Sequence, residues 1–456
     1  MFWEETIAAV STPPGTGGIG VIRISGPEAV LVADRVFHAA DGRRLSQCES
    51  HTIHYGSIKD PVTGEMLDEV LVMLMRAPRT FTKEDVVELD CHGGSYLLHK
   101  VLQVVLKQGA RLAEPGEFTK RAFLNGRIDL SQAESVMDMI GAQTEMALTA
   151  AARRLRGQLG EKIQKYRRQI MDLLVLLEVE IDYPEYEIEE VQQTDMKEAL
   201  YSLQKELENL YETADTGRML NEGIRIVLAG RPNMGKSTLL NALLGENRAI
   251  VTEIPGTTRD TLEESVNLCG IPIRLIDTAG IRDTVDIVEK MGVERAQQAI
   301  EESDLVLLLL EASVEPSEED KELLHQVKDR PYLIIRTKKD QGEKITGFGD
   351  PDKTIVLSAY TGEGVEILKK RIRDMVLKGS LQSSDGIFLA NNRQQEAVRK
   401  AAESIRSATL TLENEMGTDL VSMDLNAAYD LLGELTGNSV REDLIDTIFS
   451  RFCLGK

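Results

Sequence analysis

Cysteine, long apolar runs and basic charge are all scarce in this sequence. The four cysteines among its 456 residues are Cys48, Cys91, Cys269 and Cys453. Thiols so few and so widely scattered exclude a disulfide framework and indicate a reducing compartment, the cytoplasm. The first residues are acidic where a signal peptide would be basic, and no apolar run approaches the roughly 20 residues of a membrane span. We therefore expect neither a signal peptide nor a membrane contact.

The shortage of basic charge limits the possible partners. The formal net charge is −22, from 53 Lys and Arg against 75 Asp and Glu. A surface this acidic repels nucleic acid overall, so a contact with RNA requires a local basic patch or a basic partner. Apolar residues make up 42% and charged residues 28% of the chain, as in a soluble globular protein. The length exceeds one ordinary core and predicts about three domains.

Residues 1–120 have the mixed pattern of an α+β domain. β-rich runs bounded by turn residues predict strands at 19–25, 69–75 and 85–90. Apolar residues at helical spacing predict helices at 27–37 and 95–109.

Proline is nearly absent from residues 129–221, where Pro184 is the only one, and it is missing from residues 382–456. Apolar residues recur there every three or four positions, which predicts long helices. The acidic stretch 182–190 interrupts the first of these regions. We interpret it as a solvated connection and not a metal site, because nothing fixes its carboxylates in a cage.

The pattern between residue 223 and about residue 379 is strand, loop and helix, repeated. The expected strands are residues 224–230, 273–277, 304–311, 332–337 and 354–359. Such alternation builds a mostly parallel sheet with helices on both faces. We therefore expect a multidomain α/β protein in which this module is inserted into a helical domain. The predicted division is 1–120 for the α+β domain, 121–220 and 380–456 for the two helical parts, and 221–379 for the inserted domain.

The segment GRPNMGKS, residues 230–237, has the strand–loop–helix context of a phosphate-binding loop. Gly230 and Gly235 let backbone N–H groups face phosphate oxygens. Lys236 can reach the terminal phosphates, and Ser237 can offer its hydroxyl to Mg²⁺. Because a strand and a helix flank the segment, a chance glycine-rich turn is the weaker explanation.

Further motifs follow at the ends of the expected strands. In DTAG, residues 277–280, the carboxylate can hold the magnesium shell and the last N–H can sense the γ-phosphate. In TKKD, residues 337–340, the carboxylate can accept from the donor edge of guanine, and SAY, residues 358–360, fits a backbone contact to the base. With GTTRD, residues 256–260, supplying Thr258 as a second Mg²⁺ ligand, this order resembles the motifs of translation-factor-class GTPases.

Two positions depart from those motifs. Thr337 stands where such GTPases usually have Asn, and a hydroxyl replaces only part of the hydrogen bonding of an amide, which weakens the hold on guanine. Ile281 stands where Ras-like proteins carry the glutamine that orients the attacking water. Glu289, just before the helix expected from residue 291, is our candidate for that role. The alternative for Glu289 is an acid that only stabilises a helix N-terminus.

Seven segments in a fixed order carry a wider resemblance: residues 12–26, 81–89, 91–94, 114–134, 230–237, 253–260 and 453–456. Together they are similar to the MnmE (TrmE) family of tRNA-modification GTPases over nearly the whole chain. The resemblance implies an N-terminal domain that binds a tetrahydrofolate derivative and forms a homodimer. It also implies GTP hydrolysis and the addition, with the flavin-dependent partner MnmG (GidA), of an aminomethyl-type group to C5 of the wobble uridine of certain tRNAs.

The resemblance also implies particular site residues. The folate contacts would be Arg23, Glu88, Arg127 and Lys456. The GTP contacts would be Asn233, Met234, Gly235, Lys236, Ser237, Thr238, Thr252, Glu253, Ile254, Pro255, Gly256, Thr257, Thr258, Asp277, Thr278, Ala279, Gly280, Thr337, Lys338, Asp340, Ser358, Ala359 and Tyr360. The K⁺ ligands would be Asn233, Thr252, Ile254 and Thr257. Arginines can clamp the carboxylates of folate, and a glutamate can accept from the amino donors of its pterin. The alternative for Glu88 is simple solvation.

Cys453 lies in the tail, where an exposed thiol is prone to oxidation. Either the tail packs against its own protein, with Cys453 as a small core residue, or it delivers the thiol to an active site. The resemblance implies the second, with Cys453 as a catalytic candidate near the folate. A prenylation box is set aside because Gly455 is not aliphatic and Lys456 is not a usual last residue.

Two other classes of function remain open from the sequence. A ribosome-assembly GTPase would share the phosphate loop and GTTRD, but it would bind no folate. A folate-dependent aminomethyl-transfer enzyme with a regulatory GTPase domain would differ mainly in its substrate. Cys91 and His92 suggest a metal pair, but neighbouring residues on a strand point to opposite faces, so we do not expect one.

Overall fold

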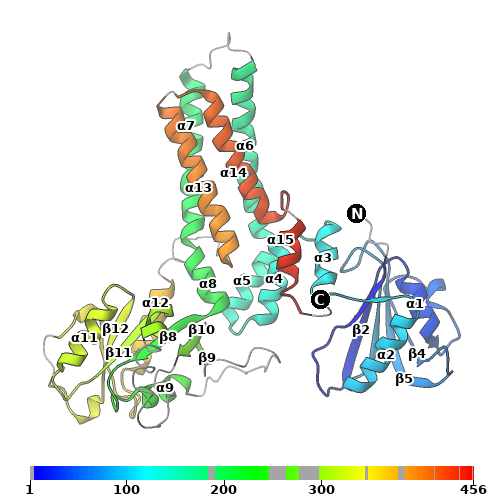
Figure 1. Cartoon of the computed structure of the whole chain (residues 1–456), viewed down its shortest axis with the longest axis horizontal. Coiled ribbons are helices and arrows are strands. Elements are labelled where there is room, and N and C mark those ends of the chain that lie inside the picture. Colours follow the sequence, from blue (N-terminus) through cyan, green and yellow to red (C-terminus); the bar gives the residue numbers. More distant parts are fainter. Residues whose placement is uncertain are drawn as a thin grey trace. The chain divides into compact units, whose positions relative to one another are not determined.

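The computed structural model describes residues 5–182, 190–245, 263–276, 297–344, 348–377, 386–414, 416–440, 442–453 and 455. Within these ranges the chain is a multidomain α/β protein with two sheets and a set of long helices (Figure 1). It divides into two compact units. The first unit is Met1–Met137 together with Gly433–Lys456, and the second is Asp138–Leu432.

The first unit is built on a seven-stranded sheet with the order β3-β4-β5-β6-β2-β1-β7. Its strands are β1 (Ile7–Val10), β2 (Ile19–Ser25), β3 (Phe37–Ala39), β4 (Thr52–Lys59), β5 (Met66–Met75), β6 (Val86–His92) and β7 (Arg111–Leu112). Neighbouring strands are antiparallel except β1 and β7, which are parallel. The expected strands correspond to β2, β5 and β6. The other four were missed because they are short, alanine-containing or largely polar.

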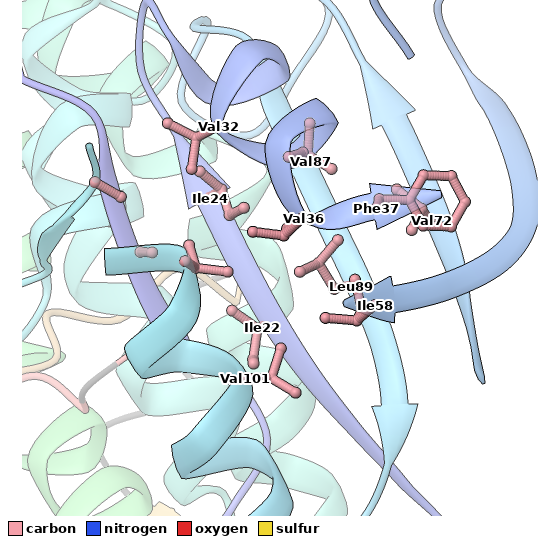
Figure 2. Packing of buried hydrophobic residues seen from close by; sticks show 14 of the residues in the cluster. Ile22, Ile24, Val32, Val36, Phe37, Ile58, Val72, Val87, Leu89 and Val101 are labelled. Atoms are coloured by element: carbon pink, nitrogen blue, oxygen red, sulfur yellow. The ribbon is translucent and has the colours of Figure 1, made fainter. Parts of the chain in front are cut away.

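Helices α1 (Ala29–Val36) and α2 (Ser95–Lys107) cover one face of this sheet. Figure 2 shows Ile22 and Leu89 of the sheet packed toward Val36 and Val101 of these helices. Because side chains alternate along a strand, the neighbours of these core residues point to the other face. That second face therefore carries the polar side chains of β2 and β6.

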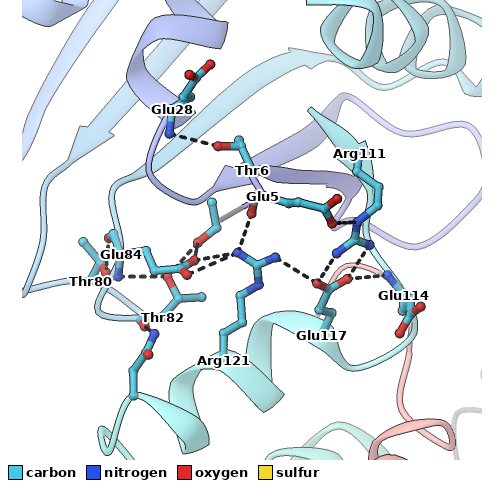
Figure 3. Close-up of polar contacts among 12 residues, drawn as sticks. Glu5, Thr6, Glu28, Thr80, Thr82, Glu84, Arg111, Glu114, Glu117 and Arg121 are labelled. Carbon is cyan, nitrogen blue, oxygen red and sulfur yellow. Dashed lines mark hydrogen bonds and ion pairs between the residues drawn. The ribbon is translucent and has the colours of Figure 1, made fainter. Parts of the chain in front are cut away.

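Helix α3 (Glu117–Leu124) is fixed to the first unit by a buried network of charges, drawn in Figure 3. Arg121 is fully buried, and its Nη1 and Nη2 donate to Glu84 at 3.2 Å and to Glu117 at 2.9 Å. Arg111 donates to the same Glu117 at 2.7 Å. Burial by itself raises the pKa of the Glu117 carboxyl, but its hydrogen bonds, first of all the one from Arg111, outweigh burial and lower this pKa. Removing one member of such a network costs about 3–5 kcal/mol, because the remaining charge stays buried. The network therefore holds α3 firmly against β7 and the loop before β6.

The second unit contains long helices at the spacing that the sequence predicted. They are α6 (Gln158–Asp182), α7 (Glu190–Glu212), α13 (Asn392–Glu413) and α14 (Thr418–Thr436), which run side by side in Figure 1. Its shorter helices are α5 (Glu145–Leu155) and α8 (Ala214–Glu222). Helix α15 (Glu442–Phe449) belongs to the first unit, and α4 (Leu130–Gly141) crosses the boundary between the units after Met137. Of the helices in the described part of the chain, none combines the length and the apolar composition needed to cross a membrane.

The second sheet has six strands in the order β13-β12-β11-β8-β10-β9. They are β8 (Ile224–Ala229), β9 (Glu263–Leu268), β10 (Ile271–Ile276), β11 (Leu305–Glu311), β12 (Tyr332–Thr337) and β13 (Thr354–Val356). All pairs are parallel except β9 with β10, and apolar clusters fill both faces. The flanking helices are α9 (Lys236–Leu244), α11 (Glu318–Val327) and α12 (Val365–Leu377). The expected parallel sheet is therefore present, with β9 missed and β13 shorter than expected.

Candidate functional site

The phosphate loop joins the end of β8 to the start of α9 through a tightly turned backbone. Positive φ values occur at Gly230 (148°), Asn233 (64°) and Gly235 (86°). A Cβ on Gly230 would approach the carbonyl oxygen of Leu309 to 2.7 Å, so only glycine fits there. The first turn of α9 leaves backbone N–H groups without helical partners, which is the usual basis of phosphate binding at a helix N-terminus.

The side chains of the phosphate loop and of the first turn of α9 differ in what they can contact. Lys236 lies over the loop, with Nζ 2.7 Å from the carbonyl oxygen of Gly230. Asn233 in the loop and Ser237 and Thr238 at the start of α9 are exposed, so their polar groups can reach a ligand. The Met234 side chain is buried in the apolar cluster that packs against the second sheet, so only its backbone can contact a nucleotide.

A pocket of about 320 Å³ adjoins the phosphate loop. It is lined by Gly235, Thr238, Thr337, Lys338, Asp340, Gln341, Ser358, Ala359 and Tyr360. The structure thus brings together eight residues that the sequence predicted as GTP contacts. Gln341 was missed, and no pattern marks it apart from its place directly after TKKD. Within the pocket, the Ser358 hydroxyl donates to Asp340 Oδ1 at 2.5 Å and orients that carboxylate.

Thr337 connects the two halves of this site. It is 2% exposed, and its Oγ1 lies 2.8 Å from the carbonyl oxygen of Met234 and 3.1 Å from that of Leu310. A hydroxyl has one hydrogen to donate, so it can satisfy only one of these acceptors at a time. Next to it, Lys338 adopts a positive φ of 58° and pairs with Glu311 at 2.7 Å, which lowers the pKa of the Glu311 carboxyl.

Other predicted residues lie outside the described residues. For the nucleotide site they are Thr252, Glu253, Ile254, Pro255, Gly256, Thr257, Thr258, Asp277, Thr278, Ala279 and Gly280. Glu289, Ile281 and Lys456 also lie outside them.

A second candidate site lies on the first unit, on the face of the sheet opposite α1 and α2. Arg23 of β2 and Glu88 of β6 are paired across the two strands, and Arg23 Nε donates to Glu88 Oε1 at 2.7 Å. The Arg23 guanidinium lies 5.5 Å from the centre of the Phe81 ring and 5.6 Å from that of Phe118. Ring faces attract cations at this range, so the two rings and the carboxylate together fix the guanidinium.

Arg127 is brought to the same place by Phe81. Arg127 Nη1 donates to the Phe81 carbonyl oxygen at 3.2 Å, and its guanidinium lies 4.8 Å from the ring centre. The Phe81 ring therefore contacts the guanidinium groups of both predicted arginines, Arg23 and Arg127. The sequence analysis missed Phe81, because its role depends on segments far away along the chain.

The tail docks beside Arg23. The carbonyl oxygen of Gly455 accepts from Ser11 Oγ at 3.0 Å and from Arg23 Nη1 at 3.5 Å, and the Gly116 N–H donates to the carbonyl oxygen of Cys453 at 3.3 Å. Phe452 is buried, whereas Cys453 is exposed. The alternative in which the Cys453 thiol is a core residue is therefore wrong, although the tail does pack against its own protein.

Cys91 and His92 point to opposite faces of the sheet, as expected for neighbours on a strand. Cys91 is 2% exposed, and burial is the main factor that raises the pKa of its thiol to about 12. The His92 side chain is exposed and hydrogen bonds through Nδ1 to Asp68 at 2.6 Å. Among the described residues there is no group of three or more His, Cys, Asp or Glu side chains that could hold a metal ion.

Comparison with known proteins gives matches along nearly all of the chain. The family model for the GTP-binding protein TrmE N-terminus matches residues 6–127, and the model for the MnmE helical domain matches residues 130–453. The chain is 47% identical to the tRNA modification GTPase MnmE of Bacillus velezensis, over 99% of this chain and 100% of the relative. It is 46% identical to the protein of that name from Clostridioides difficile, over 100% of both chains.

Among solved structures, the G domain of the T. maritima FeoB iron transporter is 30% identical over 34% of this chain and 98% of that one. Its TM-score of 0.26 is too low to support an argument.

Proposed function

The chain belongs to the MnmE family of tRNA modification GTPases, and we propose that it hydrolyses GTP in the course of modifying tRNA. The observation that carries the proposal is the hydrogen bond from Thr337 to Met234, which joins the TKKD motif to the phosphate loop beside one pocket. The N-terminus of α9 and Lys236 would bind the phosphates. The Asp340 carboxylate, oriented by Ser358, would accept from the donor edge of guanine.

The nucleotide site would bind two cations. Ser237 with Thr258 would hold Mg²⁺, and Asn233 with Thr252, Ile254 and Thr257 would hold K⁺. The exposed hydroxyl of Ser237 and the exposed amide of Asn233 support these assignments, because hard cations prefer such oxygen ligands. When bound, these cations supply positive charge that offsets the negative charge of the phosphates. Glu289 would orient the attacking water, since Ile281 has no polar group with which to do so.

The first unit would bind a tetrahydrofolate derivative as a one-carbon donor through Arg23, Glu88, Arg127 and Lys456. The clustering of two arginines on one phenylalanine, next to a carboxylate, supports this proposal. The guanidinium groups would hold the carboxylates of the folate, which are the anions that arginine matches best in geometry. Cys453, exposed on the docked tail, would take part in the modification chemistry.

The proposed partners are tRNA, the flavin-dependent protein MnmG (GidA) and a second copy of this chain, all in the cytoplasm. A homodimer through the first unit is supported by large apolar side chains exposed on the second face of its sheet. Ile53 is 64% exposed, Tyr55 56% and Leu71 46%. Together with MnmG, the protein would add an aminomethyl-type group at C5 of the wobble uridine. We also propose the domain division 1–120, 121–220, 221–379 and 380–456.

The proposal is tested by mass spectrometry of wobble nucleosides from cells that lack this chain. We expect the C5-modified uridines to disappear, to return with the native chain, and to stay absent with Lys236→Ala, because the lysine binds the phosphates. Unchanged nucleosides in cells lacking the chain would refute the proposal. The ribosome-assembly alternative predicts normal wobble nucleosides, altered ribosomal subunits and no binding of folate by the purified protein.

A further inference from the structure

The loop before β6 and the turn after α3 are fastened to each other by side chains that donate to backbone carbonyl oxygens. From the turn, Arg127 Nη1 donates to the carbonyl oxygen of Phe81 at 3.2 Å. From the loop, Lys83 Nζ donates to the carbonyl oxygens of Asn125 and Gly126, both at 3.0 Å. Since Gly126 directly precedes Arg127 in the chain, two cations are held close together on neutral acceptors.

Neither of these two cations has a carboxylate partner in the part of the chain that the structure describes. The carboxylates nearest along the chain make their contacts elsewhere. Glu84 accepts from the buried Arg121 at 3.2 Å, as Figure 3 shows, and Asp85 lies 3.8 Å from Arg76. Asp129 accepts from the first turn of α4. Two positive charges therefore remain side by side without a compensating negative charge.

A structural role explains only part of this arrangement. A lysine near the C-terminus of a helix stabilises the last carbonyl groups, and Lys83 does this for α3. An ammonium group has three N–H donors, and the two carbonyl oxygens occupy only two of them. Lys83 also has a positive φ of 60°, which a glycine would adopt without strain. Capping of α3 therefore leaves one donor and the charge of Lys83 unused.

We propose that Lys83 and Arg127 form an anion subsite for the glutamate chain of a folate that carries more than one glutamate. This inference rests on the proposed folate function and names the form of folate that the site would favour. A folate can carry several γ-linked glutamates, each of which adds a carboxylate, and lysine and arginine bind carboxylates through charge-assisted hydrogen bonds. Arg127 is exposed and Lys83 is half-buried, so a flexible chain in solvent can reach both.

The place of this subsite suits the tail of the ligand. The Phe81 ring centre lies 5.5 Å from the guanidinium of Arg23 and 4.8 Å from that of Arg127, so the subsite adjoins the candidate folate site. Arg23 is half-buried and paired with Glu88 at 2.7 Å, whereas Arg127 is exposed. The uncompensated charge therefore lies on the solvent side of the candidate site, where a lengthening glutamate chain would extend.

The test compares the binding of 5-formyltetrahydrofolate and of its pentaglutamate form to the purified full-length protein by calorimetry. We expect the native protein to bind the pentaglutamate about fivefold more tightly, the scale of one or two partly exposed ion pairs, and this ratio should fall as salt rises. Lys83→Gln keeps amide donors for the two carbonyl oxygens but removes the charge. The ratio should therefore fall by about half or more, while the monoglutamate binds nearly as before.

Three further variants separate this subsite from other effects of charge. Lys83→Arg keeps the charge and should keep most of the ratio. Lys83→Gly removes the charge at a position whose φ suits glycine, so it should lower the ratio as Lys83→Gln does. The matched control is Lys107→Gln, at the exposed end of α2 on the other face of the sheet. It removes the same charge and should leave the ratio unchanged, because salt screens a distant exposed charge.

Equal affinity of the native protein for the two forms would overturn the inference, as would an undiminished ratio in Lys83→Gln and Lys83→Gly. An equal loss in Lys107→Gln would mean that overall charge, and not this subsite, favours the longer chain. If Lys83→Gln weakened both forms alike, the lysine would act only by fastening the loop to the turn. An unchanged ratio with weaker tRNA binding in a filter assay would assign the cations to RNA phosphates instead. Failure of the native protein to bind either form would refute the proposed folate function itself, and this inference with it.

Discussion

Replacing Gly455 with alanine should release the tail from β1 while the two units stay folded. Gly455 is buried and has a positive φ of 87°. A Cβ at this position would lie 2.3 Å from the carbonyl oxygen of Val10 and 2.8 Å from Cα of Ser11. Both obstacles are backbone atoms next to a paired strand, so no side-chain rotation relieves the overlap.

The magnitude follows from comparing the strain with the contacts that hold the tail. The positive φ alone costs an alanine about 1 kcal/mol, and the overlap with backbone adds to it. Against this stand the hydrogen bonds from Ser11 and Gly116, worth about 0.5–1.5 kcal/mol each, and the longer one from Arg23. The strain equals or exceeds these contacts, so the docked state becomes the minor one. Phe452 remains packed, and global stability should change by less than about 1 kcal/mol, as for surface changes.

Hydrogen–deuterium exchange measures the tail directly. In Gly455→Ala the amides after Phe452 and the Gly116 N–H should exchange rapidly, GTP hydrolysis should be normal, and wobble-uridine modification should be lost. The matched control is Gly64→Ala, where φ is also positive at 71° but no atom lies within 4 Å of the added Cβ. That variant should keep the tail protected. Full protection of the tail in Gly455→Ala, or normal modification with an exposed tail, would refute this reasoning.

Four further predictions concern the two candidate sites. GTP turnover should be much faster in K⁺ than in Na⁺, and Asn233→Ala should remove the difference in a phosphate-release assay; equal native rates in both salts would exclude the K⁺ site. Glu289→Ala should lower turnover by about 10²-fold with GTP affinity unchanged, the scale for a positioned acid or base group; near-normal hydrolysis would assign water orientation elsewhere. Asp340→Asn should weaken GTP and favour xanthosine triphosphate, measured as competing dissociation constants. Cys453→Ser should fold, bind folate and hydrolyse GTP normally but fail in wobble-uridine modification, and normal nucleosides would return the thiol to a passive role.

The elements that the sequence predicted are those with strong local patterns. The strands from β8 to β12, apart from β9, are apolar runs bounded by turns, and the long helices repeat apolar residues at helical spacing. The missed strands lack such patterns. β7 has only two residues, and four of the six residues of β9 are acidic or polar, so both are strands because of the partners they pair with. Pairing between distant segments has no local signature in the sequence.

The folate candidate site shows the same limit. Arg23 and Glu88 were found through a motif resemblance, but their hydrogen bond joins residues 65 positions apart. The contact between Ser11 and Gly455 spans 444 positions. Local patterns do not predict such contacts, because loop closure over long distances depends on the packing of everything between. Phe81 was missed for this reason.

The structure gives the threonine at position 337, where such GTPases usually have asparagine, a different interpretation from the one that the sequence suggested. From the sequence, a threonine in place of asparagine weakens the hold on guanine. In the structure, the buried Thr337 hydroxyl faces carbonyl oxygens of the phosphate loop and of β11. The first position of TKKD therefore fastens the motif to the phosphate loop, and it makes this connection with one hydrogen where an amide has two. On the proposed function, Asp340 and Ser358 would select the base, and Thr337 would affect how rigidly the phosphate loop and TKKD are held together.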